Sequence, residues 1–307
     1  DQYRDRSNLV RAYSSKINGM SIRFHPSKEV KLAIGDEVLV KVVSSEIVED
    51  RINPPPPYTM SEILRDAANI LKMSTSEVAG TLQDLFEAGF ITYPRTDSAR
   101  VSDAGLAVAR NYITQILGLD ESYFYPRKWG EGGAHEAIRP TKPLSSQDLK
   151  NYIQQGLIYT PIALAWRHYA VYDLIFRRFI ASQMPPATVV KQVIKLSAQK
   201  DGKDVEVEPN PLEIPLRYVS DGFARVSPPF RELHEELRES QFTAKIENFY
   251  EYRRVELYSE GDLVDEMKRK GIGRPSTYST IVKTIITRKY VILISERKKI
   301  VPTKLGI

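Results

Sequence analysis

The stretch Gly89-Phe90-Ile91-Thr92-Tyr93-Pro94-Arg95-Thr96-Asp97-Ser98 places a phenol, a guanidinium, a carboxylate and hydroxyl groups directly after a predicted helix. Free tyrosine has a pKa of about 10, so a tyrosine nucleophile needs cationic help and a proton acceptor. Arg95 and Asp97 can share one side of an extended chain with Tyr93, and an arginine can hold a phosphate oxygen through two hydrogen bonds. The stretch indicates phosphoryl transfer by Tyr93. The alternatives are a tyrosine used for packing and an ion pair between Arg95 and Asp97.

A second motif is Gly130-Glu131-Gly132-Gly133-Ala134-His135-Glu136-Ala137-Ile138-Arg139-Pro140-Thr141. Its glycines allow a ligand to approach the backbone closely, and His135 can donate to a phosphate or relay a proton near neutral pH. A structural role for His135 remains equally open. A histidine followed by a glutamate, without a second histidine or a cysteine at ligand spacing, is a weak metal signal, so no metal site is predicted in this chain.

The third motif is Gly271-Ile272-Gly273-Arg274-Pro275-Ser276-Thr277-Tyr278. Pro275 suits the first turn of a helix, and Ser276 and Thr277 with free backbone N–H groups beside Arg274 can form an anion site. An ordinary helix cap would use the same residues. The Gly-x-x-x-x-Gly-Lys-Ser/Thr pattern of a nucleotide-binding loop is absent from the sequence.

Composition sets the broad class. With 307 residues, 42% of them hydrophobic, the chain is expected to form two or more domains. A net charge of +5 favours polyanionic partners without requiring them. The absence of cysteine excludes disulfides and thiolate zinc sites and favours an intracellular or a heat-adapted protein, which we expect to be cytoplasmic. No signal peptide or membrane-spanning stretch is predicted. Because the chain begins with Asp1, we expect it to be a piece of a longer polypeptide.

The apolar pattern predicts a β-rich domain that is interrupted by a helical one. Alternation over 19–48 indicates antiparallel strands, including one over 30–34, and four prolines at 54–57 end them. Capping boxes at Thr59 with Glu62 and at Ser74 with Glu77 predict two helix starts. Gly89 ends the second helix, and a strand over 90–93 would complete a winged-helix-like unit. Further helices are predicted over 102–117, 145–156 and 161–181, and strands over 188–196, 205–207, 216–219 and 244–249.

The last part of the chain repeats the pattern of helices followed by a wing. A helix starts near Ser259, stops at Gly271, restarts after the third motif and runs to about Arg288, and two short strands follow. Aromatic and basic residues around 169–179 and 123–129 can stack on bases, but at helical spacing core packing is the more ordinary explanation. We therefore do not include them in the predicted site.

The three motifs, in this order, resemble those of the type IA DNA topoisomerases. His168-Tyr169-Ala170-Val171-Tyr172-Asp173-Leu174-Ile175-Phe176-Arg177-Arg178-Phe179 and the glycine-rich stretch before Ala134 are similar to the topoisomerase half of archaeal reverse gyrases. The resemblance implies a multidomain α+β toroidal fold, in which a β-rich arch carries a helical, winged-helix-like domain that bears the tyrosine. It assigns 1–57 and 186–257 to the arch, 58–185 to the helical domain, and 258–307 to a winged-helix-like DNA-binding segment.

The same resemblance implies roles for individual residues. Tyr93 would attack single-stranded DNA to form a 5′-phosphotyrosyl link, with Arg95 and His135 as its catalytic partners. The implied DNA-binding residues are Asp97, Arg139, Arg274, Ser276 and Thr277. Because the phosphotyrosine keeps the energy of the broken bond, rejoining would need no nucleotide.

The chain departs from the family pattern at one point. The family's Toprim domain carries a catalytic glutamate and an Asp-x-Asp magnesium motif, and no Asp-x-Asp occurs in this sequence. We expect Mg²⁺, and ATP through a helicase-like half, to act only through parts of the polypeptide outside this chain. The chain alone is then expected to bind single-stranded DNA without completing cleavage and rejoining.

Two alternatives remain from the sequence. One is a non-catalytic single-stranded-DNA-binding module in which Tyr93 is structural. The other is a tyrosine recombinase, which would form a 3′-phosphotyrosyl link and needs a dispersed set of arginine and histidine residues around a C-terminal tyrosine. The order of the motifs does not provide that set.

Overall fold

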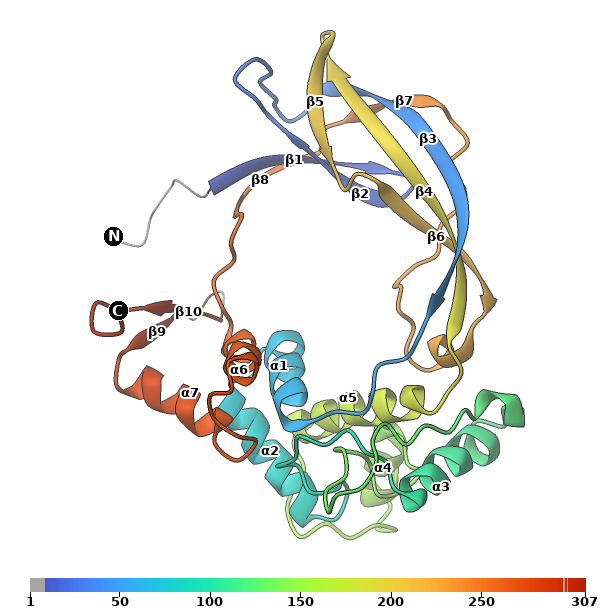
Figure 1. The fold of residues 1–307 in the computed structure, drawn as a ribbon, viewed down its shortest axis with the longest axis vertical. Helices are drawn as coiled ribbons and strands as arrows, with labels where there is room; N and C mark the ends of the chain where they lie inside the picture. The colour runs from blue at the N-terminus through green and yellow to red at the C-terminus, as the bar shows by residue number, and fades with distance from the viewer. Residues whose placement is uncertain (1–8, 295, 297) are drawn as a thin grey trace. The chain divides into compact units, whose positions relative to one another are not determined.

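A computed structural model describes residues 9–294, 296 and 298–307 of the chain (Figure 1). The chain divides into two compact units. We call them the β-rich unit, which comprises residues up to 52, 186–221 and 228–256, and the helical unit, which comprises 53–185, 222–227 and 257–307. The sequence therefore leaves the β-rich unit and returns to it, and each unit is assembled from separate segments.

The β-rich unit is an antiparallel sheet in the order β7-β3-β4-β5-β2-β1-β8, with β6 paired to β4. Its strands are β1 (Leu9–Ile17), β2 (Met20–His25), β3 (Glu37–Ile52), β4 (Ala187–Lys200), β5 (Lys203–Glu208), β6 (Leu212–Ser220), β7 (Gln241–Lys245) and β8 (Asn248–Arg253). Alternate residues of these strands, such as Ile22 with Phe24 and Val38 with Val40, are fully buried in one hydrophobic core. The period-2 pattern in the sequence thus identifies the face that packs inward.

The predicted strand over 30–34 is wrong. No strand forms there, and although Val30 and Leu32 pack into the core, Ile34 is 63% exposed. The carboxylate of Asp36 accepts a hydrogen bond from the N–H of Ala33 (2.8 Å) and pairs with Lys200 (2.5 Å). Such local bonds from an aspartate favour a turn over a strand ladder.

The predicted strand over 244–249 is two strands with different partners. β7 pairs with β3, whereas β8 pairs with β1. Between them the backbone of Ile246 donates to Asp36 (2.9 Å) and accepts from Gly35 (2.9 Å). The chain changes partners at this residue, which a periodicity argument does not detect because both halves alternate in the same way.

The helical unit contains the helices α1 (Met60–Leu71), α2 (Thr75–Glu87), α3 (Asp103–Asn111), α4 (Ser146–Gln154), α5 (Trp166–Ser182), α6 (Glu260–Arg269) and α7 (Tyr278–Thr287), and the hairpin of β9 (Val291–Ile294) and β10 (Lys299–Pro302). A π-helical turn, Tyr112–Ile116, extends α3. The capping box at Ser74 is confirmed, because Glu77 N–H donates to Ser74 Oγ (3.1 Å) and Ser74 N–H donates to the Glu77 carboxylate (2.8 Å). None of the described helices is both long enough and apolar enough to cross a membrane.

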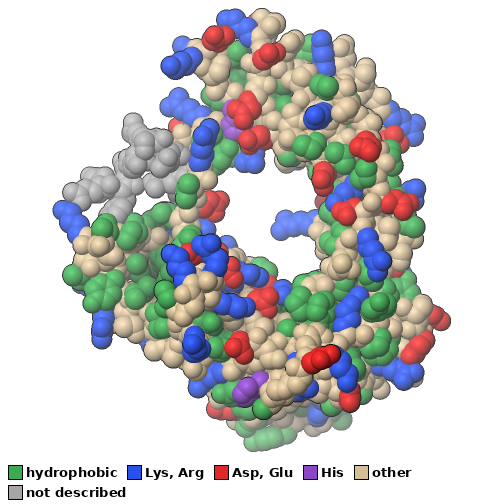
Figure 2. All heavy atoms as spheres, in the orientation of Figure 1, with side chains coloured by type: hydrophobic (Ala, Val, Ile, Leu, Met, Phe, Trp, Pro, Cys, Tyr) green, Lys and Arg blue, Asp and Glu red, His purple; other side chains and the backbone are tan. Residues whose placement is uncertain are grey.

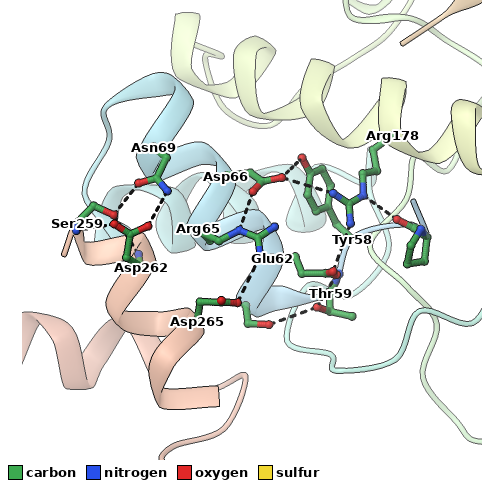
Figure 3. A network of polar contacts seen from close by, with 12 residues as sticks. Tyr58, Thr59, Glu62, Arg65, Asp66, Asn69, Arg178, Ser259, Asp262 and Asp265 are labelled. Atoms are coloured by element: carbon green, nitrogen blue, oxygen red, sulfur yellow. Dashed lines mark hydrogen bonds and ion pairs between the residues drawn. The ribbon is translucent and has the colours of Figure 1, made fainter. Parts of the chain in front are cut away.

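A polar network joins α1 to α5 on one side and to α6 on the other (Figure 3). Arg178 of α5 stacks over the ring of Tyr58, with its guanidinium carbon 4.3 Å from the ring centroid, and contacts Glu62 and Asp66 of α1. Asn69 of α1 donates to Asp262 of α6 (3.0 Å). Burial and the charge of Asp66 raise the pKa of the Tyr58 hydroxyl well above its usual value, so it stays protonated and donates to Asp66 (2.8 Å).

The predicted strand over 90–93 is also wrong. The only β pairing there is an isolated bridge between Ile91 and Pro140, and Thr92 and Tyr93 lie in a loop. After α6 and α7, the β9–β10 hairpin follows in the predicted order. The winged-helix description of both regions stays a prediction.

Two helical glycines test the close contact between α1 and α6. A Cβ at Gly261 would lie 2.8 Å from the Cα and the carbonyl oxygen of Arg65, whereas a Cβ at Gly80 in α2 would have no neighbour within 4 Å. We expect Gly261→Ala to lower the free energy of unfolding by about 1–3 kcal/mol, because backbone atoms have to move apart. Gly80→Ala should raise it by about 0.5–1 kcal/mol. Urea denaturation of both variants checks this, and a Gly261→Ala protein as stable as Gly80→Ala would contradict the tight contact.

Candidate functional site

Residues 89–98, the tyrosine loop, are fixed on one side by the second sequence motif. Thr92 donates through its N–H to Arg139 O (3.0 Å) and through its hydroxyl to Ala137 O (2.7 Å), and its hydroxyl accepts from Arg139 N–H (3.0 Å). Thr141 donates through its N–H to Phe90 O (3.0 Å) and through its hydroxyl to Gly89 O (2.6 Å). Two motifs that are far apart in sequence are therefore hydrogen-bonded to each other.

Thr96 fixes the other end of the tyrosine loop. It is 2% exposed, its carbonyl accepts from the N–H of Met60 at the start of α1 (2.9 Å), and its hydroxyl accepts from Ser98 N–H (3.0 Å). Between the two threonines, exposed and buried residues alternate, with Tyr93 and Arg95 exposed. Asp97 is exposed in the same alternation. The loop is thus held by its threonines while the residues predicted to carry the chemistry face solvent.

The ring of Tyr93 rests against two other rings. It meets Phe86 of α2 edge-on, with centroids 5.4 Å apart and an interplanar angle of 73°, and it stacks on His135, with centroids 6.0 Å apart and an angle of 28°. Tyr93 nevertheless remains 41% exposed. These contacts restrict the ring and bring His135, predicted from the second motif, beside the predicted nucleophile.

Arg139 occupies a different position from the other predicted DNA-binding residues. It is 6% exposed, and its guanidinium binds both carboxylate oxygens of Glu136 (3.1 and 2.9 Å), the carbonyl of Pro140 (3.0 Å) and the hydroxyl of Ser102 (3.3 Å). Burial opposes ionisation of Glu136, but the bonds from Arg139 and Ser102 outweigh it and hold the pKa of this carboxyl below its usual value. In this structure the guanidinium of Arg139 stabilises the segment that holds the tyrosine loop.

Gly105 in α3 makes room for this guanidinium. A Cβ at position 105 would lie 2.7 Å from Nε of Arg139 and 2.8 Å from a methyl group of Val101. The sequence analysis missed Gly105, Glu136, Thr92 and Thr96 as positioning residues. Thr92, Thr96 and Glu136 lie inside the motifs described above, so their sequence context could have indicated a positioning role. Nothing in the sequence around Gly105 indicates its contact with Arg139.

The third motif forms the turn between α6 and α7. Gly271 and Gly273 adopt positive φ angles of 71° and 79°, and Arg274 N–H donates to the hydroxyl of Thr277 (2.9 Å), the residue that precedes α7. Arg274, Ser276 and Thr277 are all exposed. The turn therefore presents an arginine and two hydroxyl-bearing residues to solvent at the start of a helix, which suits a phosphate ligand.

Tyr278 connects the third motif to the tyrosine loop. Burial raises the pKa of its hydroxyl, the charge of Arg274 opposes the increase, and the charge of Asp97 adds to it. Asp97 thus lies within electrostatic reach of the first residue of α7, and α2 contacts α7 directly. The helical unit consequently brings all three motifs into one region.

The ion pair of Glu136 with Arg139 gives a prediction for stability. We expect Glu136→Gln to lower the free energy of unfolding at neutral pH by about 1–3 kcal/mol, because it leaves a buried guanidinium with a weaker partner. The pKa of Glu136 is lower in the folded state than its ordinary value of 4.5. The ionised carboxylate therefore stabilises the folded protein fully above pH 4.5, and this stabilisation is lost as the pH falls through the folded-state pKa. The difference between wild type and Glu136→Gln should therefore shrink below pH 4.5.

Thermal unfolding from neutral to acidic pH checks this. Glu131→Gln is the matched control, because Glu131 lies in the same motif but is exposed. Equal effects of the two substitutions at neutral pH would show that the pair with Arg139 contributes nothing to stability.

Comparison with known proteins is consistent with this arrangement. Residues 20–307 match the family described as DNA topoisomerase. The chain is 45% identical to a reverse gyrase of Pyrococcus furiosus over 88% of its length, covering 22% of that protein. The whole length of this chain is 38% identical to reverse gyrase 2 of Sulfurisphaera tokodaii, and it covers 26% of that protein. The chain thus spans about a quarter of these curated relatives.

The fold is similar to a solved structure as well. Full-length topoisomerase I from Thermotoga maritima matches with a TM-score of 0.69 and 30% identity, over 97% of this chain and 50% of that one. The resemblance predicted from the three motifs is confirmed by sequence and by fold. The chain belongs to the DNA topoisomerase family, in its type IA branch, and reverse gyrases are among its relatives.

Proposed function

We propose that this chain supplies the nucleophile for reversible cleavage of single-stranded DNA. The phenolic oxygen of Tyr93 attacks a backbone phosphorus, the P–O3′ bond breaks, and the products are a 5′-phosphotyrosyl link and a free 3′-hydroxyl. Attack by that hydroxyl reverses the step, so no nucleotide is consumed. The observation that carries the proposal is the 41% exposure of Tyr93 on a loop whose threonines are hydrogen-bonded on both sides of it.

Arg95 and His135 are the proposed catalytic partners. Arg95 is exposed two residues from Tyr93, where a bidentate guanidinium can neutralise the charge that develops on the phosphate. The phenol must lose a proton and the leaving 3′ oxygen must gain one. The imidazole of His135, stacked on Tyr93, is placed to hydrogen-bond the phosphate or to assist that transfer.

The third motif is the proposed holder of the strand. Arg274, Ser276 and Thr277 are exposed, and phosphate contacts of this kind position a nucleic acid without reading its sequence. Lys and Arg side chains are interspersed with Asp and Glu across the visible face of the molecule (Figure 2). The charge that holds DNA is therefore expected to be local to such motifs.

Magnesium does not fit the described residues near Tyr93. The carboxylate of Glu136 is bound by Arg139, and Asp97 is the one acidic residue of the tyrosine loop, so Mg²⁺ would need further ligands from elsewhere. We propose that its ligands, like any coupling to ATP and positive supercoiling, belong to Toprim and helicase-like parts of the whole protein. The β-rich unit would then be the arch of a toroid that lets the helical unit move away.

A non-catalytic single-stranded-DNA-binding module is the second candidate. The packing of Tyr93 between Phe86 and His135 favours it, because those contacts would also suit a structural tyrosine. The two candidates differ in whether a covalent intermediate forms.

Covalent trapping separates them. The chain is mixed with a reverse-gyrase Toprim segment, Mg²⁺ and an oligonucleotide labelled at its 5′ or its 3′ end, and is then denatured. We expect only label from the 3′ side of the cut to stay on the protein, and Tyr93→Phe to abolish it because no phenolic oxygen is left to attack.

Tyr152→Phe is the matched control, because Tyr152 is 39% exposed in the same unit, close to the 41% of Tyr93. Label retained by Tyr93→Phe, or label from the 5′ side of the cut, would refute the proposal. Relaxation of a supercoiled plasmid by the chain alone would refute the need for the Toprim part.

Strand binding gives a separate prediction. We expect Arg274→Ala to weaken binding of single-stranded oligonucleotide about threefold to tenfold at low salt, and to reduce the slope of log K against log salt by about 0.7. Fluorescence anisotropy over a salt series measures both. Arg269→Ala is the control, since Arg269 is also exposed but pairs with Glu266 (2.6 Å). Equal losses in the two variants would show that the third motif makes no specific phosphate contact.

A further inference from the structure

A histidine and two glutamates cluster in the β-rich unit, away from the proposed chemistry. His25 on β2 lies directly opposite Glu206 on β5, and Glu208 lies opposite Arg23, one pleat further along. The three side chains of His25, Glu206 and Glu208 each offer a ligand atom within 4.8 Å of the others. Figure 2 shows a histidine among acidic and basic side chains on the visible face of the β-rich unit.

The ring of His25 is oriented by the backbone. Its Nδ1 lies 3.3 Å from the carbonyl oxygen of Arg11, and a carbonyl accepts only, so Nδ1 carries the proton. In the neutral ring this leaves a lone pair on Nε2. A histidine that donates one ring nitrogen to a backbone carbonyl and turns the other inward is typical of metal ligands.

Nε2 of His25 forms no hydrogen bond among the described residues and faces a carboxylate. The residue is 8% exposed, and Nε2 is buried and forms no hydrogen bond. An oxygen of Glu208 lies 3.0 Å from this nitrogen, close enough for an ion pair if the ring is protonated. A lone pair facing a carboxylate oxygen at this distance is repulsive unless a proton or a cation lies between them.

We propose that His25, Glu206 and Glu208 bind one divalent zinc-class cation. One imidazole and two carboxylates form a donor set suited to Zn²⁺, with bonds of about 2.0–2.2 Å that place neighbouring ligand atoms roughly 3–3.5 Å apart. The separation of 3.0 Å between Nε2 and the Glu208 oxygen falls in that range. The cluster borders a cavity of about 740 Å³, which leaves room for water to complete the coordination.

The competing explanation is a set of ion pairs without metal, in which a protonated His25 pairs with Glu208. Arg11, Arg23 and Arg254 border the same cavity. However, Arg11 pairs with Glu251 (3.2 Å), and Arg23 lies 3.9 Å from Glu208, at the limit of an ion pair, while its guanidinium carbon is 5.3 Å from the ring centroid of Tyr252. Among the described contacts none of these arginines bonds to Nε2 of His25, whereas a bound divalent cation would occupy its lone pair.

The position of the cluster gives the metal a structural role. β2 and β5 pair through three residue pairs, Arg23 with Glu208, Phe24 with Val207 and His25 with Glu206. In the strand order, this short ladder joins β1, β2 and β8 to the remaining strands of the sheet. A cation held by both strands would crosslink the ladder, so binding should stabilise the folded β-rich unit.

The test uses the whole chain at neutral pH. After chelator treatment and dialysis, Zn²⁺ is added, the protein is desalted, and bound metal is measured by mass spectrometry. We expect about one equivalent of Zn²⁺, a higher unfolding temperature with Zn²⁺ than without, and Co²⁺ absorption bands of a nitrogen- and oxygen-coordinated site. His25→Ala, Glu206→Gln and Glu208→Gln should each weaken binding more than about tenfold.

His234→Ala is the matched control, because it removes another histidine of the same unit outside the cluster and should retain the zinc. Glu206→Gln alters an exposed side chain and is expected to fold, as circular dichroism without metal would verify. No zinc on the wild-type chain, or equal zinc on wild type and the three cluster variants, overturns the proposal. Neither result bears on Tyr93, whose covalent trapping is a separate measurement.

Discussion

The proposed nucleophile, Tyr93, has to be exposed and fixed at the same time, and the hydrogen bonds of Thr92 and Thr96 meet both requirements. Exposed loops are ordinarily mobile, because water competes for their backbone groups. Here Thr92 is bonded three times to the segment containing Arg139, and Thr96 is bonded to the start of α1. The loop gains the backbone partners that a strand would provide without extending into a sheet, so Tyr93 and Arg95 face outward. Positioning a reacting group in advance removes an entropic cost from the reaction itself.

The rest of the helical unit supports this loop through α1. The first N–H of α1 donates to the carbonyl of Thr96. The carbonyl of Tyr58, the residue that precedes Thr59 before this helix, accepts a hydrogen bond from Ile138 N–H, and Asn69 near the end of α1 donates to Asp262 of α6. α1 and Tyr58 before it thereby contact the tyrosine loop, the second motif and the helix that precedes the third motif. Many of these contacts are polar and partly buried. Such contacts contribute little net stability, but any alternative arrangement that leaves one of the charges unpaired is penalised. Apolar packing could hold the same helices together with less control over their register.

The parts of the structure that follow from local chemistry were predictable from the sequence. The helix start at Ser74 was predictable because a capping box involves residues that are three apart. The core strands were predictable because buried and exposed residues alternate along them. The turn over 30–34 was not predicted, although the bond from Ala33 to Asp36 that favours it is local. The segments over 90–93 and 244–249 were not predictable, because their pairing depends on distant partners such as Pro140 and β1. The site divides in the same way. Tyr93 and His135 are brought together as the motifs predicted, but a motif does not reveal that Arg139 is buried while Arg274 is exposed.

The missing side chain at Gly105 restricts how this family of sequences can change. Any Cβ there would occupy the space of the Arg139 guanidinium, and without that guanidinium the carboxylate of Glu136 loses its partner. Substitution at position 105 is therefore tolerable only together with changes at 139 and 136. Natural variation at these three positions is therefore expected to be coupled, even though 105 and 139 are more than thirty residues apart in the sequence.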